Sequence, residues 1–199
     1  RIVSLLLLSA FGGAVLGMLA TGSRSPMAWL VLTASGFFSA AGASGINQYL
    51  ERNRDSKMGR TAKRPLASNQ IRHPERVLWA GLLMVFGATA LALTINVAMA
   101  VWVLAGAVIY VAIYTIWLKP RTTLNIVIGG AAGSCAVLSG GAAMGAWADP
   151  AVLLLAGLIF VWTPVHFWAL AIAYRKDYAQ ADYPMLPTKV SPKTAAFWT

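Results

Sequence analysis

The sequence NQYLERNRDSKMGRTAKRPLAS, at residues 47–68, is a polar segment in a chain that is otherwise strongly apolar. It holds two of the six acidic residues and six of the sixteen Lys and Arg residues, whereas 58% of all residues are hydrophobic and only 11% are charged. Soluble domains contain about 25% charged residues. This composition is therefore typical of a protein whose solvent is the lipid bilayer, and the polar segment separates membrane-embedded parts of the chain.

Apolar runs that are long enough to cross a bilayer flank the polar segment on both sides. We predict six spanning helices, at residues 2–20, 27–46, 77–95, 99–118, 124–146 and 151–173. Glycine-rich stretches such as FGGAVLG and IGGAAGSCAVLSGGAAMGA would weaken a helix in water, but small residues allow helices to pack closely in lipid. The predicted fold class is an all-α, polytopic transmembrane helix bundle that forms a single domain over residues 1–199.

The basic residues predict how this bundle is oriented. If residue 1 lies inside, the inside segments hold fifteen of the sixteen Lys and Arg residues, and only Arg24 lies outside. Cytoplasmic loops are enriched in Lys and Arg, so we expect an integral protein of the cell inner membrane with its polar segments on the cytoplasmic side. Membrane orientation thereby explains the net charge of +10 without a nucleic-acid partner. Every acid except Asp149 also falls inside, which this rule does not explain.

Asn47, Glu51 and Asp55 follow one another at intervals of four residues. If the second helix continues through them, their side chains lie on one face, about one turn apart. Such a row of oxygen ligands suits Mg²⁺, which also binds the phosphate oxygens of a substrate. The bases that follow could hold the same phosphates: Arg60, Lys63 and Arg64. The same spacing also fits a solvated loop in which acids pair with neighbouring bases, so spacing alone leaves both interpretations open.

A second group of charges follows the sixth apolar run, in the sequence HFWALAIAYRKDYAQADYPMLP at residues 166–187. It lies on the same predicted side of the membrane and contains Arg175, Lys176, Asp177 and Asp182. Two such clusters could clamp a diphosphate through a metal ion and stabilise its departure. Nearby aromatic rings could stabilise an allylic cation, although each ring also fits plain packing or an interfacial position: Tyr49, Trp162, Phe167, Trp168, Tyr174 and Tyr178.

Three single residues carry weaker signals. His166 lies within the sixth apolar run, two residues after Pro164. An ionisable residue inside a membrane is a candidate functional residue, although a neutral His bonded to a neighbouring helix fits as well. We expect His73 to be a solvated residue of the inside loop. We expect Cys135 to be a small buried hydrophobe, because its surroundings lack the bases that activate a thiol.

With these motifs the chain resembles the UbiA-type intramembrane prenyltransferases. The pattern N-x-x-x-E-x-x-x-D followed by GRTAKRPL is similar to the first motif of that family, with Glu51 where Asp is frequent. The segment at 166–187 and NIVIGG at 125–130 resemble the protohaem IX farnesyltransferase (haem O synthase) branch. The resemblance covers essentially the whole chain. Members of the family have about nine spans, so we expect that this chain lacks parts at both ends, including its C-terminal helices.

The resemblance implies an enzyme that transfers the farnesyl group of farnesyl diphosphate to a vinyl group of haem B and so makes haem O. Mg²⁺ would be its cofactor, and haem B a substrate. It implies catalytic and metal-binding roles for Asn47, Glu51, Asp55 and Asp177, diphosphate binding by Arg60, Lys63, Arg64 and Lys176, and acceptor binding by His166. From the charges and aromatic rings around these motifs we add Asp182 to the metal ligands, Arg175 to the diphosphate-binding bases, and Tyr49 and Trp168 to the acceptor-binding residues.

Besides the two substrates and membrane lipid, the implied partners are haem A synthase and oxidase assembly factors. Two alternatives to this function stay open from the sequence. One is prenylation of an aromatic acceptor, such as a quinone or chlorophyll precursor. The other is a non-catalytic transporter or scaffold, although transporters more often carry charge at the midplane of the membrane than at one face.

Overall fold

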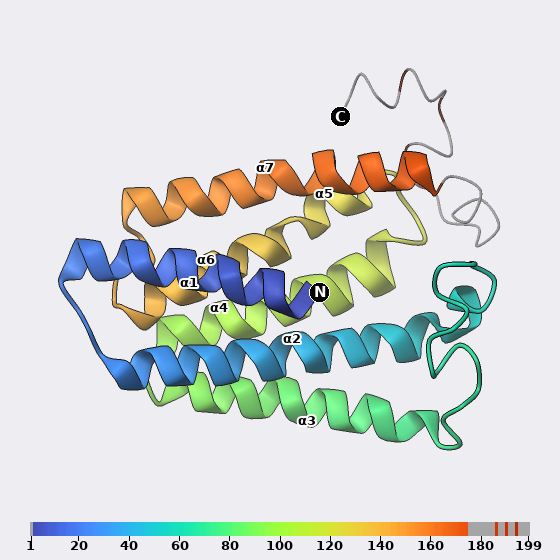
Figure 1. The fold of residues 1–199 in the computed structure, drawn as a ribbon, viewed down its shortest axis with the longest axis horizontal. Helices are drawn as coiled ribbons and strands as arrows, with labels where there is room; N and C mark the ends of the chain where they lie inside the picture. Colours follow the sequence, from blue (N-terminus) through green and yellow to red (C-terminus); the bar gives the residue numbers. More distant parts are fainter. Residues whose placement is uncertain (1, 175–185, 187–189, 191–193, 195–199) are drawn as a thin grey trace.

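The computed structural model describes residues 2–174 together with residues 186, 190 and 194. Within them the chain forms helices only, as predicted (Figure 1). The elements are α1 (Ile2–Thr21), α2 (Pro26–Asp55), α3 (Pro74–Leu93), α4 (Val97–Val108), η1 (Ile109–Leu118), α5 (Asn125–Gly129), α6 (Ala131–Ala143) and α7 (Pro150–Ala173).

Six helical segments of the described chain are long and apolar enough to cross a membrane, in agreement with the six predicted spans. Two of them are composite. The segment Val97–Leu118 consists of α4 followed by η1, which is a π-helix, and the segment Asn125–Ala143 consists of α5 and α6. We predicted a single helix in each place, because an apolar run by itself gives no sign of a change in helical pitch.

At the end of the bundle opposite to the polar segment, polar side chains cap the N-termini of three helices. Ser25, Asn96 and Asp149 are the N-caps of α2, α4 and α7, and each accepts a hydrogen bond from a backbone N–H group in the first turn. Such caps satisfy donors that a helix end leaves without a partner. Asp149, the single acid on the predicted outer side, thus has a structural role.

Glycine allows two pairs of helices to touch through their backbones. A Cβ atom added at Gly13 of α1 or at Gly140 of α6 would collide with a backbone carbonyl group of the facing helix. One added at Gly42 of α2 would lie 2.7 Å from the carbonyl oxygen of Gly81 in α3. Small residues at such contacts permit the close van der Waals packing that holds helices together in lipid, as the glycine-rich stretches predicted.

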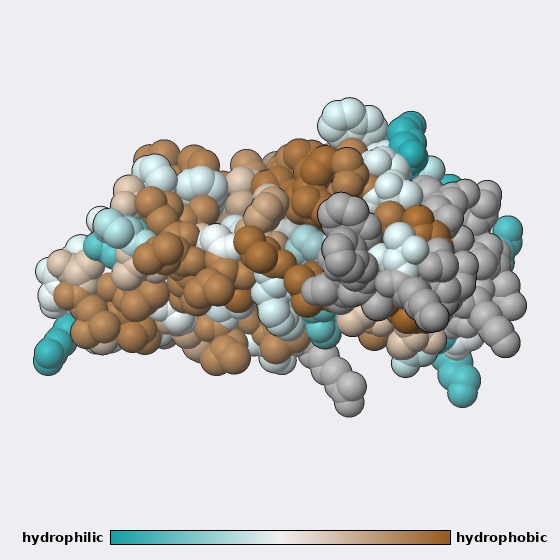
Figure 2. Space-filling model, turned by 90° about the horizontal axis from the view of Figure 1, so that it is seen from above, coloured by the Kyte–Doolittle hydropathy of each residue, from teal (hydrophilic) through white to brown (hydrophobic). Residues whose placement is uncertain are grey.

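Large apolar side chains cover the outside of the bundle. Leu19, Leu83 and Leu154 are 74, 76 and 71% exposed, and they come from three different helices. In Figure 2 the hydrophobic residues form a broad surface, and the hydrophilic residues lie mainly towards its two ends. Exposure of this extent is unfavourable in water but not in hydrocarbon, so the surface is that of a membrane-embedded bundle.

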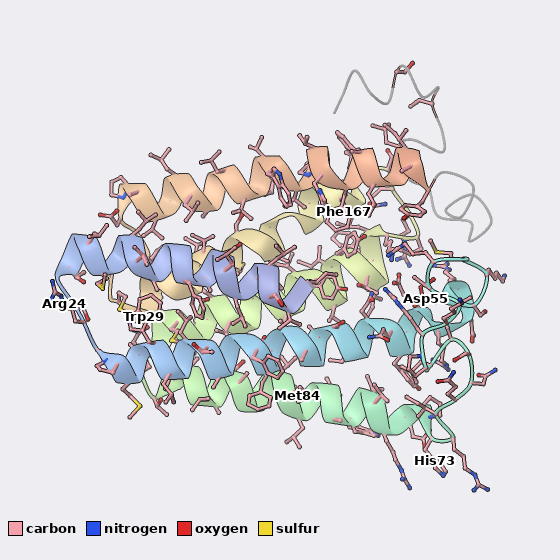
Figure 3. The ribbon with its side chains drawn as sticks, in the orientation of Figure 1. Arg24, Trp29, Asp55, His73, Met84 and Phe167 are labelled. Carbon is pink, nitrogen blue, oxygen red and sulfur yellow. The ribbon has the colours of Figure 1, made fainter. Side chains whose placement is uncertain are left out.

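The polar segment and the end of α7 lie at the same end of the bundle (Figure 1). In Figure 3 Asp55 and His73 are at this end, whereas Arg24 is at the opposite one. Polar residues predicted to lie on opposite sides of the membrane are therefore found at opposite ends of the bundle. The end that carries Asp55 is called the motif end below.

Candidate functional site

At the motif end, α2 carries three polar side chains on one buried face. Asn47, Glu51 and Asp55 are only 5, 6 and 3% exposed, and all three belong to the helix. The predicted continuation of the second helix through Asp55 is thus confirmed. The alternative of a solvated loop is wrong, because both carboxylates are buried. A buried carboxylate is costly unless it is paired, so each of them needs a positive partner.

Lys119 is the partner of Glu51. Its Nζ atom lies 2.5 Å from Oε1 and 2.7 Å from Oε2 of Glu51, so that the ammonium bridges both carboxylate oxygens. The two side chains are 12 and 7% exposed. Burial lowers the pKa of Lys119, and the neighbouring Glu51 carboxylate opposes this shift because it stabilises the charged form. The two residues hold the end of η1 and the end of α2 together.

Arg64 is the partner of Asp55. The Nη1 atom of Arg64 donates to Oδ2 of Asp55 over 2.8 Å. The loop between α2 and α3 folds back to make this contact, and Thr61 supports it by donating from Oγ1 to the Asp55 carbonyl oxygen over 2.9 Å. Of the three predicted phosphate-binding bases, Arg64 therefore lies at the acids. Arg60 and Lys63 are exposed on the same loop.

Asn47 links the row on α2 to η1. Its Nδ2 atom donates to Glu51 Oε2 over 3.0 Å and to Thr115 Oγ1 over 3.0 Å. Thr115 and Lys119 thus approach the same face of α2 from the π-helix and its end. Short π-helical stretches are rare and occur frequently at functional sites. The cluster of Asn47, Glu51, Asp55 and their partners is called the acid row below.

Sequence reasoning missed Thr115 and Lys119 as site residues. Both lie 68 residues along the chain from their partners on α2, and Lys119 was counted only among the bases that orient the protein. One signal could have indicated Lys119. Two acids on a face of a helix that enters the membrane require bases nearby, and Lys119 follows an apolar run directly.

Replacement of Lys119 by Met should destabilise the protein, because its partner Glu51 is buried. Because Lys119→Met leaves the Glu51 carboxylate buried without this cation, we expect a loss of roughly 3 kcal/mol of stability and a drop in melting temperature of roughly 5–10 °C. Thermal unfolding of the purified protein in detergent measures this drop. Adding Glu51→Gln to the same chain should restore most of it. A double variant no more stable than Lys119→Met alone would contradict the assignment of the pair.

The second charged cluster lies outside the described residues: Arg175, Lys176, Asp177 and Asp182. Tyr178 lies outside them as well. The structure does describe the residue that precedes this cluster. The guanidinium carbon of Arg60 is 5.9 Å from the centre of the Tyr174 ring. The end of α7 therefore contacts the loop that carries the bases of the first motif.

The acceptor candidates lie in different surroundings. Tyr49 is two residues from both Asn47 and Glu51, about 200° around the helix, and the Arg52 guanidinium covers its ring at 4.4 Å. The structure thus does not bring Tyr49 to the acid row. The indole nitrogen of Trp168 is buried and has no hydrogen-bond partner among the described residues.

His166 is exposed on α7, where its ring stacks on Trp162 at 4.5 Å and meets Phe167 edge-on at 5.7 Å. The structure gives it aromatic neighbours rather than a place at the acid row. His73 is exposed and its Nδ1 atom lies 3.0 Å from Glu75 Oε1, and Cys135 is buried. Both of these residues are as predicted.

The ligand chemistry of the acid row fits a magnesium ion. Within the described residues no group of three or more His, Cys, Asp and Glu side chains is arranged to hold a metal. The row instead offers two carboxylates and one amide, which are hard oxygen ligands. Mg²⁺ is typically bound by one or two carboxylates and completes its coordination with water and phosphate oxygens, so this donor set suits it.

Residues 6–199 match the model of the UbiA prenyltransferase family. The chain belongs to the UbiA prenyltransferase family. The predicted resemblance is confirmed, and this member of the UbiA family is an integral membrane protein with six apolar helices in its described part.

Two named relatives are similar over nearly the whole chain. This UbiA-family chain is 41% identical over 187 residues to "Protoheme IX farnesyltransferase" of Metallosphaera sedula, which covers 94% of this chain and 64% of that protein. It is 43% identical over 195 residues to the protein of the same name from Saccharolobus islandicus, with 98% and 67% covered. The chain thus spans about two thirds of the length of these relatives.

The fold is similar to that of a solved structure of the same family. A UbiA homolog from Archaeoglobus fulgidus, bound to DMAPP and Mg²⁺, aligns with a TM-score of 0.73. The alignment covers 98% of this chain and 69% of that one, at 15% sequence identity. At such low identity the similarity shows the UbiA fold, and it confirms the predicted fold class.

Proposed function

We propose that this protein transfers the farnesyl group of farnesyl diphosphate to a vinyl group of haem B and so makes haem O. The observation that carries the proposal is the acid row: two buried carboxylates and an amide on one helix face, paired with two partly buried bases, at one end of an apolar bundle. The names of the relatives that are 41 and 43% identical support haem B as the acceptor.

In this function Asn47, Glu51 and Asp55 would hold Mg²⁺. The bound ion would neutralise charge on the diphosphate and so make it a better leaving group. Lys119 and Arg64 lie within hydrogen-bond distance of the same carboxylates, which puts their positive charges where phosphate oxygens would bind. The related structure that binds DMAPP and Mg²⁺ supports this use of the fold.

The remaining bases would complete the diphosphate site from the loop and from the end of α7. We assign this role to Arg60 and Lys63, together with Arg175 and Lys176, and we assign Asp177 and Asp182 to the metal. The contact between Arg60 and Tyr174 supports the arrangement, because Tyr174 directly precedes the second cluster in the sequence and lies against the loop of the first.

For the acceptor, Trp168 is better supported than Tyr49 or His166. Its buried indole N–H group has no partner among the described residues and could donate to a carboxylate of haem. The Tyr49 ring is covered by the Arg52 guanidinium, and the His166 ring is stacked on Trp162. We therefore propose Tyr49 and His166 as acceptor-binding residues of second rank, after Trp168.

The distribution of bases supports an inner-membrane protein whose motif end faces the cytoplasm, since among the Lys and Arg residues that the structure describes only Arg24 lies at the other end. Farnesyl diphosphate would then reach the acid row from the aqueous side, with its tail in the apolar bundle. Haem O would pass to haem A synthase or to oxidase assembly factors, which we propose as partners.

Incubation of membranes containing the protein with haem B, farnesyl diphosphate and Mg²⁺ tests the proposal. We expect haem O, identified by its mass and visible spectrum. Removal of the metal with EDTA should lower its formation to roughly one-hundredth or less, and excess Mg²⁺ should restore it. Membranes without the protein are the control. A prenylated aromatic acid in place of haem O would favour the alternative acceptor, and formation unaffected by EDTA would reject the metal role.

A further inference from the structure

The hydroxyl group of Thr115 is placed between two partners. Its Oγ1 atom lies 2.8 Å from the carbonyl oxygen of Tyr110 and 3.0 Å from Nδ2 of Asn47. A hydroxyl group has one hydrogen atom and two lone pairs, and a carbonyl oxygen can only accept. Thr115 must therefore donate its hydrogen to Tyr110. Towards Asn47 the Thr115 oxygen can then only accept a hydrogen bond, so the NH₂ group of the Asn47 amide must face Thr115.

Glu51 imposes the same orientation on the amide. The second hydrogen on Nδ2 of Asn47 goes to Glu51 Oε2 over 3.0 Å, and a carboxylate likewise only accepts. Both amide hydrogens are thus used within the acid row, which leaves Oδ1 as the atom of the amide that can bind a cation. The two anchors differ in one respect. A cation bound by Glu51 would compete for its oxygen atoms, whereas it would leave the neutral Thr115 hydroxyl unaffected.

The π-helix provides the carbonyl group that holds the Thr115 hydroxyl in place. Thr33, Thr89 and Thr163, which lie in α-helices, each donate to the carbonyl group four residues earlier. Thr115 instead reaches back five residues to Tyr110. This spacing is that of the wider turn of η1, and it holds the Thr115 hydroxyl where it also contacts Asn47 of α2.

We propose that Thr115 is a positioning residue: held by the π-helical carbonyl group of Tyr110, its hydroxyl turns the Asn47 amide so that Oδ1 is presented to a divalent cation. The inference rests on the proposed function in one respect, namely that the acid row binds Mg²⁺ together with a prenyl diphosphate. It does not depend on haem as the acceptor.

The test measures binding in the absence of any acceptor. Purified protein in nanodiscs is mixed with radiolabelled farnesyl diphosphate, and the Mg²⁺ concentration that gives half-maximal retention is determined. Residues that orient a metal ligand typically change metal affinity by 10–100-fold, so Thr115→Val should raise this concentration about 10-fold, and high Mg²⁺ should restore retention. Thr115→Ser keeps the hydroxyl and should stay close to the unsubstituted protein.

Thr89→Val is the matched control, because it also removes a threonine hydroxyl that donates within a spanning helix, but away from the acid row. If Thr115→Val does not give a monodisperse protein, Thr115→Ala and Thr115→Ser replace it, since they are close in size and only Ser has a hydroxyl.

Equal Mg²⁺ requirements in Thr115→Val and Thr89→Val would overturn the inference, and so would a Thr115→Ser variant as impaired as Thr115→Val or Thr115→Ala. Absence of Mg²⁺-dependent retention in the unsubstituted protein would overturn it together with the metal role. Retention without haem O formation would reject only the proposed acceptor.

Discussion

Asp55→Ala is expected to lower haem O formation by a factor on the order of 10²–10³, which is the usual loss when one group that stabilises developing charge is removed. Asp55 is the last residue of α2 and is buried against Arg64. Its replacement removes one proposed metal ligand and also frees the Arg64 guanidinium. The rate of haem O formation in membranes with equal amounts of protein measures the effect.

Glu75→Ala is the control for this variant. Glu75 is an exposed carboxylate at the same end of the bundle, where it contacts His73. Its loss changes the net charge by the same amount and should leave the rate nearly unchanged. Comparable rates in Asp55→Ala and in the unsubstituted protein, at equal expression, would remove Asp55 from the site.

Gly140→Val is expected to have the largest effect on folding. A Cβ atom at this position collides with the backbone carbonyl group of Ala10, and neither α1 nor α6 can yield by moving a flexible side chain. Overpacking of this kind typically costs about 1–3 kcal/mol and sometimes more. We expect a melting temperature lower by roughly 10 °C, or loss of the monodisperse protein, measured in detergent.

Gly157→Val in α7 is the control, because it makes the same Gly-to-Val change in a spanning helix without a collision between helices. A Cβ atom at Gly157 meets no other atom within 4 Å, so the added side chain has open space. Its melting temperature should stay close to that of the unsubstituted protein. Similar melting temperatures for Gly140→Val and Gly157→Val would show that the approach of α1 to α6 does not limit stability.

The acid row could be predicted in part because its spacing is local. Residues four apart on a helix share a face whatever surrounds them, so Asn47, Glu51 and Asp55 followed from the sequence. Thr115 and Lys119 did not follow, because which part of a distant span packs on α2 depends on tertiary structure. The π-helix that turns them to this face has no signature in an apolar run.

Proximity along the chain was a poor guide to the aromatic residues. Tyr49 lies between two members of the acid row in sequence, yet the helix carries its ring to the other side, where Arg52 covers it. His166 was singled out as an ionisable group within a span, and it lies on the exposed side of α7 beside Trp162. In both cases the direction of the side chain around its helix decided the outcome.

The pairing of both carboxylates with bases has a consequence for how ligands bind. A divalent cation alone would compete with Lys119 and Arg64 for Glu51 and Asp55, and a diphosphate alone would compete with the carboxylates for the bases. If the two arrived together, the cation would bind the carboxylates and the anion would bind the bases, so neither group would be left uncompensated. We therefore expect each ligand to raise the affinity for the other, and linkage requires the two factors to be equal.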